Sequence, residues 1–488
     1  MPTRTNRFSI ILLIFVWLTG CMPSTPVATP RPTFTPAATS IPTVTPTPSP
    51  EKGTPGMGDP YFPKLGNGGY DVQTYTIAME VDPSANHVSG STTITANTTE
   101  RLGSFNLDFH GFTIDSIDVN GEAAKHSRLG DELTVTSSTT LEQDQPFTVV
   151  VKYNGTPELI RSTPIDIQMG WSHAENGAIN VWGEPDAASA WFPNNNHPRD
   201  KATYRFEITV PQPWLVAATG VLKETKETGD KTLYVWEMNQ PMATYLASIN
   251  IDQYEVFTEA GPNGVTIRSY FPKDMPDSSR SAYNILPEAI EFFNKLFGPY
   301  PFDEYGVVVA SQDGICAETS LALEAQSLSI HCPVMGSEAV IVHELAHQWF
   351  GDSVSLENWK DIWLKEGFAS YAEWLWASKN DPVALARIAK NRDAMFFDSD
   401  FPVAEPSPDN LYTDDSYTGG ALVLNALRLE VGDDIFFKIL QTYAAQYRFG
   451  NAGTDEFILV AEEVSGKDLE LFFKEWVYSK RLPDLPKP

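Results

Sequence analysis

The segment HELAHQWFG, residues 343–351, decides the fold of this chain together with WLKEGFASY, residues 363–371. His343 and His347 are four residues apart, so on an α-helix both imidazoles lie on one face, one turn apart. Two neutral imidazoles in this arrangement can take two corners of a Zn²⁺ tetrahedron. Glu366, in the second segment, offers a third ligand, and three protein ligands leave one corner open to water. The spacing therefore predicts a catalytic zinc site.

The residues around the two histidines favour a buried helix. Apolar side chains surround the motif on almost every side: Val340, Ile341, Val342, Leu345, Ala346, Trp349 and Phe350. Two histidines and Glu344 in such a helix are costly unless something pairs with them, and a metal ion is the simplest partner. Ser337 is a good N-cap and Gly351 a good stop, so we predict a helix over residues 337–351. The alternative is a structural histidine pair on a solvated helix.

Composition predicts a protein of two or three domains. A length of 488 residues exceeds one ordinary domain, and a hydrophobic content of 42% with 12% aromatic residues is ample for folded cores. The net charge of −29 at pH 7 excludes a general nucleic-acid binder, so we expect no nucleic-acid partner. This charge is typical of a soluble acidic surface and gives at most a weak preference for cationic substrates.

The N-terminal segment is interpreted as a targeting signal. Arg4 and Arg7 precede an apolar run, residues 8–18, that is too short to span a bilayer comfortably but suits a signal-peptide core. The run ends in Leu18-Thr19-Gly20-Cys21, which resembles the bacterial lipobox, and the resemblance implies lipidation of Cys21. We therefore expect an extracytoplasmic protein, lipid-anchored to the bacterial cell membrane. The alternatives are an ordinary signal peptide and an uncleaved anchor.

The pattern along the chain divides it into four segments. Residues 1–21 are predicted to be the lipoprotein signal peptide. Residues 22–62 are rich in Pro, Thr, Ser and Ala and are predicted to be a disordered linker. Residues 63–260 contain strands of period two separated by turn residues, which predicts a β-sandwich-like domain. Residues 261–488 begin as a mixture of helices and strands and become all-helical, which predicts an α+β catalytic domain.

Individual elements follow from the same periodicities. Tyr75, Ile77, Met79 and Val81 alternate with smaller or polar residues and predict a half-buried strand. Strands are also predicted at 304–311 and 319–330. The predicted helices other than the zinc helix span residues 279–297, 361–378, 383–396, 416–430, 433–447, 454–464 and 467–480.

Two cysteines remain besides Cys21. Cys316 and Cys332 lie near the two ends of the strand predicted at 319–330. In an oxidising compartment they could form a disulfide. A straight strand of this length would hold its ends too far apart for that bond. The sequence leaves both possibilities open.

The motifs together resemble those of the gluzincin aminopeptidases, the aminopeptidase N and leukotriene-hydrolase family. Beyond the two zinc segments, three stretches carry the resemblance: WFPNNNHPRDKATYRFEITVP from Trp191, SLALEAQ from Ser320 and SYTGGALVLNALRLEVG from Ser416. They arrive in the family's order and span residues 70 to 480. The resemblance implies a thermolysin-like α+β catalytic domain after the β-sandwich-like domain, without the large C-terminal helical domain of longer relatives.

The resemblance assigns the metal chemistry to four residues. His343, His347 and Glu366 match the ligands of one Zn²⁺ per chain. Glu344 matches the general base, which sits beside the metal without ligating it. Glu373, two turns beyond Glu366, is a candidate hydrogen-bond acceptor for a ligand imidazole, or else a surface residue.

The resemblance also assigns substrate contacts. Glu324 matches the strand glutamate that binds the substrate's free α-ammonium, and Glu184 falls where the β domain lends a Gln or Glu to the same pocket. Tyr417 matches the tyrosine that stabilises the oxyanion, with Tyr412 as its rival. Lys365 departs from the family's usual Asn or Asp, and we interpret it as a tolerable change.

The expected function is therefore a zinc aminopeptidase acting on peptides with a free N-terminus. The strand around Glu324 lacks the family's usual first Gly and last Asn, which puts the pocket's geometry in doubt. Two alternatives stay open. One is another hydrolase on this scaffold, an endopeptidase or an epoxide hydrolase. The other is a non-catalytic surface module that binds peptides.

Overall fold

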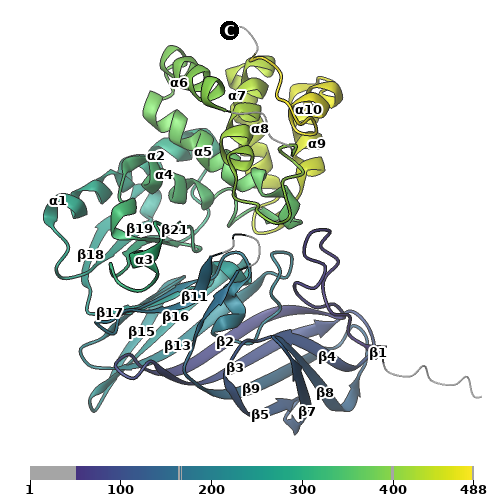
Figure 1. Ribbon diagram of the computed structural model, residues 1–488, viewed down its shortest axis with the longest axis vertical. Helices are drawn as coiled ribbons and strands as arrows, with labels where there is room; N and C mark the ends of the chain where they lie inside the picture. Colours follow the sequence, from purple (N-terminus) through teal and green to yellow (C-terminus); the bar gives the residue numbers. More distant parts are fainter. Residues whose placement is uncertain (1–50, 163–164, 166, 397–400, 486–488) are drawn as a thin grey trace, which may run out of the picture. The chain divides into compact units, whose positions relative to one another are not determined.

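The computed structural model describes residues 51–162, 165, 167–396 and 401–485 (Figure 1). The predicted signal peptide, Cys21 and residues 22–50 of the predicted linker lie outside the described residues, so these assignments stay predictions. None of the described helices is both long and apolar enough to cross a membrane.

Alternating burial along long strands builds the first part of the fold. In β2 (Tyr70–Asp82) the side chains of Tyr75, Ile77, Met79 and Val81 are all buried, as the period of two predicts. Its eight-stranded sheet contains, in spatial order, β15 (Val221–Thr228), β16 (Lys231–Met242), β13 (Ala202–Pro211), β2, β3 (His87–Thr98), β9 (Pro146–Gly155), β5 (Thr113–Val119) and β6 (Glu122–Ala123).

Two smaller sheets accompany this large sheet. One contains β1 (Glu51–Lys52), β4 (Leu102–Asp108), β8 (Glu132–Leu141) and β7 (Lys125–Leu129). The other contains β10 (Leu159–Arg161), β11 (Gln168–His173), β12 (Ile179–Trp182), β17 (Ile249–Asp252) and β14 (Leu215–Ala218). The buried apolar side chains of these strands form the core of a β-rich domain.

Helices cover a five-stranded sheet in the second part (Figure 1). The sheet contains β18 (Glu255–Ala260), β19 (Thr266–Phe271), β20 (Glu304–Val309), β22 (Leu328–His331) and β21 (Ala322–Leu323). The helices are α1 (Asp277–Arg280), α2 (Leu286–Phe297), α3 (Ile315–Glu318), α4 (Glu338–His347), α5 (Trp363–Ser378), α6 (Pro382–Met395), α7 (Gly420–Val431), α8 (Asp433–Gln446), α9 (Thr454–Ser465) and α10 (Glu470–Trp476). A β domain followed by this α+β domain confirms the predicted fold class.

Short elements complete the chain. Strands β23 (Ser355–Leu356) and β24 (Asn451–Ala452) form a two-stranded parallel sheet. Single helical turns are η1 (Ala187–Ala190), η2 (Thr244–Leu246), η3 (Pro262–Gly264), η4 (Ser281–Ile285), η5 (Pro333–Met335), η6 (Trp359–Asp361) and the π-helical η7 (Asp415–Gly419). The described residues after α10 contain no further large helical domain.

The linker prediction is wrong for residues 51–62. Strand β1 pairs with β4, and the Asp59 carboxylate is buried, where it accepts hydrogen bonds from the Trp359 amide at 2.9 Å and from His197 Nε2 at 3.2 Å. The Tyr61 hydroxyl donates to the Pro406 carbonyl at 2.9 Å. Composition is a poor guide here because this segment is held by polar anchors together with the partly buried side chains of Tyr61 and Phe62.

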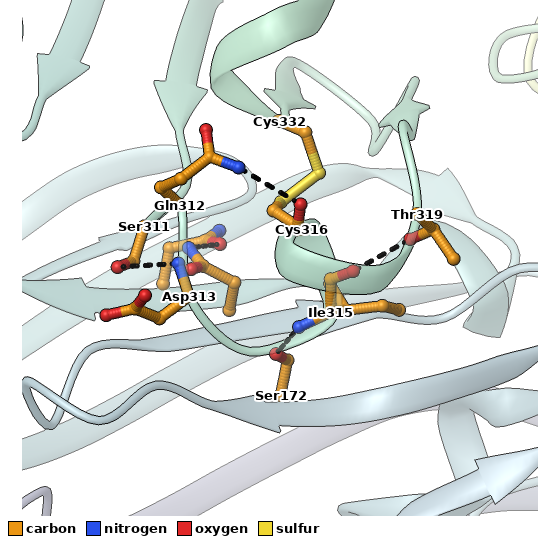
Figure 2. Close-up of a disulfide and its surroundings, with 10 residues drawn as sticks. Ser172, Ser311, Gln312, Asp313, Ile315, Cys316, Thr319 and Cys332 are labelled. Atoms are coloured by element: carbon orange, nitrogen blue, oxygen red, sulfur yellow. Dashed lines mark hydrogen bonds between the residues drawn. A yellow bond between two sulfur atoms is a disulfide. The ribbon is translucent and has the colours of Figure 1, made fainter.

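The single strand predicted at 319–330 is also wrong. The chain forms two short antiparallel strands, β21 and β22, joined by a turn in which Ser327 has a φ of +64°. This turn brings Cys332 back beside α3, and Cys316 and Cys332 form a disulfide with Cα atoms 5.5 Å apart (Figure 2). A straight strand over the same 16 residues would separate the ends by roughly 50 Å.

This disulfide is expected to contribute measurably to stability. Replacing both cysteines, Cys316→Ser with Cys332→Ser, removes a cross-link that closes a loop of 16 residues, and we expect the free energy of unfolding to fall by about 3 kcal/mol. Urea denaturation without reductant measures the change. Reductant should lower the stability of the wild-type protein and leave the double variant unaffected. Equal stability of the two proteins would mean that the bond does not form.

Polar contacts join the two parts of the chain near α4. Lys201, before β13, donates from Nζ to the carbonyl of Asp352 at 2.8 Å and to that of Ser353 at 3.2 Å. The amide of Ile315 donates to Ser172 Oγ at 3.0 Å (Figure 2). These bonds tie the β-rich part to the loop after α4 and to the start of α3.

Candidate functional site

Helix α4 begins with a side-chain cap and carries the zinc motif. Ser337 Oγ accepts a hydrogen bond from the Val340 amide at 3.4 Å. Glu338 lies in the first turn, where the negative charge of a carboxylate interacts favourably with the positive end of the helix dipole. The helix was predicted to end at Gly351, but it ends at His347. The chain turns there, and Gly351 adopts a φ of +133°. Its buried residues include His343, Glu344 and His347.

The three predicted metal ligands converge on one point. Glu366 lies on α5, which packs against α4. Its Oε2 is 3.3 Å from His343 Nε2 and 3.5 Å from His347 Nε2. The potential ligand atoms of the three residues all lie within 4.8 Å of one another. Tetrahedral ligands at zinc distances of about 2.0–2.1 Å are about 3.3 Å apart, so the separations fit a zinc ion.

The other ring nitrogens orient the imidazoles. His343 Nδ1 lies 2.8 Å from Glu373 Oε1, and His347 Nδ1 lies 3.1 Å from the Phe350 carbonyl oxygen. Each Nδ1 can therefore donate its hydrogen and leave a lone pair on Nε2, where a metal ligand needs it. Glu373 is thus in contact with a ligand imidazole and is not a free surface residue.

Glu344 is placed beside the ligands without joining them. It sits between the histidines on α4 and is 6% exposed. Its carboxylate makes no hydrogen bond to any described residue, although it lies within 4.8 Å of potential ligand atoms of Glu324 and His347. Burial raises the pKa of Glu344 well above its ordinary value. A buried carboxylate without a protein partner is suited to exchange protons with water.

Tyr417 lies against the metal site on a π-helical turn. This turn, η7, directly precedes α7. The Tyr417 ring stacks on the His343 ring with centroids 5.8 Å apart and an interplanar angle of 19°. Gly367 and Gly420 let α5 and α7 approach each other closely, because a Cβ on Gly420 would lie 2.7 Å from the Gly367 Cα. Burial raises the pKa of Tyr417 well above its ordinary value, so the phenol keeps its proton.

Tyr412 serves a different group from Tyr417. Its hydroxyl donates to Glu184 Oε1 at 3.0 Å. The two tyrosines that the sequence left as rivals are therefore separated by the structure: one stacks on a histidine of the metal site and the other binds a carboxylate.

The two carboxylates expected to bind an ammonium come together around Lys365. Glu184 follows β12 and Glu324 follows β21, and both are buried. The Gln348 side chain donates to the Glu324 carbonyl at 3.1 Å and fixes its backbone. Lys365 Nζ donates to Glu184 Oε1 and, at 2.5 Å, to Glu324 Oε1.

Sequence reasoning missed the role of Lys365. Its helix is apolar on the neighbouring positions, with Trp363, Leu364, Phe368 and Ala369 all buried. A lysine in such a helix is buried too, and a buried ammonium requires carboxylate partners. The sequence alone therefore predicts carboxylate partners for Lys365, and the structure identifies them as Glu184 and Glu324.

Electrostatics keep Lys365 charged. Burial alone lowers the pKa of Lys365, but Glu184, Glu324 and Glu366 outweigh this effect and hold it well above its ordinary value. Burial likewise raises the pKa of Glu366, and the charges of Lys365 and His347 reverse the shift to well below the ordinary value. Burial raises the pKa of Glu184 to about 8 even though Lys365 opposes the rise.

Two family models match the chain. The Peptidase M1 N-terminal domain matches residues 71–246, and the Peptidase family M1 domain matches residues 281–476. The second match contains the metal triad, Glu344, Glu324 and Tyr417, and the first contains Glu184.

Solved structures extend the similarity over both domains. An M1 zinc metallopeptidase from Deinococcus radiodurans is 31% identical with a TM-score of 0.81, and the alignment covers 89% of this chain and 99% of that one. A mutant of the same enzyme bound to a Tyr-Ser-Ala substrate is 30% identical with a TM-score of 0.82. That alignment covers 89% of this chain and 100% of the mutant enzyme.

Curated relatives are longer and more distant. Glutamyl aminopeptidase from Homo sapiens is 26% identical over 343 residues, which is 64% of this chain and 36% of that protein. Probable aminopeptidase 2 from Sulfurisphaera tokodaii is 24% identical over 325 residues, 61% of this chain and 40% of that protein. The chain thus spans well under half the length of these relatives.

Proposed function

The chain belongs to peptidase family M1, and on that premise we propose that it is a zinc-dependent aminopeptidase that hydrolyses the N-terminal peptide bond of peptides. One observation carries the proposal. Two imidazole nitrogens and the Glu366 carboxylate meet at zinc-ligand spacing, directly beside the Glu184 and Glu324 carboxylates. The tripeptide bound to the similar Deinococcus enzyme supports peptides as the substrate class.

The proposed chemistry divides between the metal and the protein. A bound Zn²⁺ would supply Lewis acidity, which polarises the scissile carbonyl and makes water a stronger acid. Glu344 would take a proton from the attacking water and return it to the leaving amine. Its position next to the triad, without a protein hydrogen-bond partner among the described residues, suits both transfers.

Tyr417 would act on the developing oxyanion. Its ring packs on His343, so its hydroxyl group belongs to the metal site, and its raised pKa keeps it a hydrogen-bond donor. A donor aimed at charge that appears only during the reaction stabilises the transition state more than the substrate.

We predict different effects for the two tyrosines. Tyr417→Phe should lower kcat about 100-fold with little change in KM, because it removes only a transition-state hydrogen bond. Tyr412→Phe is the matched control, and it should leave kcat nearly unchanged and raise KM a few-fold through its contact with Glu184. Steady-state kinetics on one substrate measure both. The reverse pattern would make Tyr412 the oxyanion donor.

Two other functions fit these residues less well. An endopeptidase or epoxide hydrolase on this scaffold has no need of paired carboxylates one residue upstream of the cut, and Glu184 and Glu324 argue against it. A non-catalytic peptide-binding module has no need of Glu344 or of a complete ligand set. All of these residues are present and close together.

A pair of substrates tests the proposal. A panel of L-aminoacyl 4-nitroanilides should be cleaved by the zinc-loaded protein and not after treatment with a chelator. Their N-acetylated forms, which lack the ammonium, should be cleaved at least about 100-fold more slowly in kcat/KM. Equal cleavage of free and acetylated forms would reject the aminopeptidase and favour the endopeptidase. No cleavage of either, with peptide binding retained, would favour the binding module.

A further inference from the structure

The Lys365 ammonium group already contacts the two carboxylates that, in the proposed function, bind the ammonium of the substrate. Its Nζ contacts Glu184 Oε1, Glu324 Oε1 at 2.5 Å and Glu366 Oε1 at 3.2 Å. Of the three N–H donors of this ammonium, two donate to Glu184 Oε1 and Glu324 Oε1, while the contact with Glu366 Oε1 is an ion pair. A substrate ammonium must therefore either displace Lys365 or bind beside it.

The second oxygen of each carboxylate is left for another partner. Glu184 Oε1 accepts from both Lys365 and Tyr412, while Glu184 Oε2 and Glu324 Oε2 make no hydrogen bond to any described residue. Glu366 Oε2 faces the two histidines instead, at 3.3 and 3.5 Å. Lys365 thus contacts one oxygen of each of the three carboxylates, and the Oε2 atoms of Glu184 and Glu324 keep their capacity to accept hydrogen bonds.

Lys365 approaches these carboxylates from the interior of the protein. Its side chain is 0% exposed, whereas the side chains of Glu184 and Glu324 are 9% and 3% exposed. Nζ lies 5.5 Å from the centroid of the Tyr245 ring, and a Cβ on Gly351 would lie 3.5 Å from the Lys365 Cβ. This packing holds Lys365 in the interior, whereas the side chains of Glu184 and Glu324 keep some exposure.

We propose that Lys365 is a positioning residue that fixes the Glu184 and Glu324 carboxylates so that their Oε2 atoms together bind one substrate ammonium. The inference rests on the proposed function. Each of the two carboxylates then contacts Lys365 through Oε1 and the substrate ammonium through Oε2. Each negative charge therefore lies next to two positive charges. Without Lys365 the two carboxylates repel each other and lose their common orientation.

Removing the resident charge tests the proposal. In Lys365→Met we expect KM for an aminoacyl 4-nitroanilide to rise at least about tenfold while kcat changes less than about threefold. Preference over the N-acetylated form should fall by the same factor as KM rises. Calorimetry with L-phenylalaninamide, a binding measurement independent of turnover, should show the same loss of affinity. Lys390→Met, an exposed lysine on α6, is the matched control and should leave all three values unchanged.

Tighter substrate binding by Lys365→Met would mean that Lys365 occupies the ammonium site instead of positioning its carboxylates. If Lys365 merely fills the ammonium site, Lys365→Met should bind the amide more tightly and lower KM. Unchanged binding would also overturn the proposal. Failure of the wild-type protein to discriminate free from acetylated substrates would reject the proposed function itself, so the two failures are distinguishable.

A measurement on the unaltered protein covers the case in which the variant does not fold. Two acceptor oxygens need two N–H donors, so a substrate with an N-methylated terminus should retain kcat/KM within about fivefold. An N,N-dimethylated terminus, with one N–H, should lose at least about tenfold more. If the substrate displaces Lys365 and gains a third acceptor, the first methyl group should already cause the larger loss, which would overturn the proposal.

Discussion

Glu344→Gln is expected to lower kcat about 1,000-fold while KM and zinc content stay near those of the wild-type protein. The amide keeps the size of the carboxylate but can neither take a proton from water nor pass one to the leaving amine. Positioned general bases contribute roughly 10²- to 10⁴-fold, and one residue performs both transfers here. Steady-state kinetics and metal analysis of the purified variant measure the effect.

The control for this prediction lies on the same helix. Glu338→Gln makes the same chemical change at an exposed position in the first turn of α4, where the amide oxygen can still accept the hydrogen bond from Trp376 Nε1. It should leave kcat unchanged. Substantial activity in Glu344→Gln with intact zinc would point to a different base. Loss of zinc from that variant would instead mean that Glu344 acts as a ligand.

The grouping of the two histidines could be predicted from the sequence because its geometry is local. A spacing of four residues on one helix fixes the relation between His343 and His347 in any context. Glu366 could be named from the sequence as a candidate third ligand, but its distance from the histidines could not be predicted, since eighteen intervening residues fix no distance by themselves. The strand alternation in β2 was equally local, and its buried residues were predicted correctly.

The parts that escaped prediction depend on contacts between distant segments. Glu184 and Glu324 lie 140 residues apart in the chain, and only the folded protein shows that one lysine bridges them. The turn that splits the strand predicted at 319–330 has no Gly or Pro signal, because Ser327 takes the left-handed conformation. Residues 51–62 are ordered by partners such as Trp359, about 300 positions away.

The largest effect is expected for a ligand of the metal. His347→Ala should reduce zinc from one ion per chain to almost none and lower kcat at least about 10⁴-fold, equivalent to about 5.5 kcal/mol of transition-state stabilisation. Two remaining protein ligands bind Zn²⁺ much more weakly than three, and alanine at this buried position, 1% exposed, supplies no ligand atom. Metal analysis and kinetics measure the two losses.

Thermal unfolding separates loss of the metal from loss of the fold. A ligand that binds only the native state stabilises it, by about 4 kcal/mol at a free concentration 1,000 times its Kd. A chelator should therefore lower the Tm of the wild-type protein and of the control His126→Ala, which alters an exposed histidine on β7. The Tm of His347→Ala should not respond to the chelator. If this variant keeps one zinc per chain and its Tm still responds to the chelator, the metal is held elsewhere. The site on α4 and α5 has by then lost one of its three ligands.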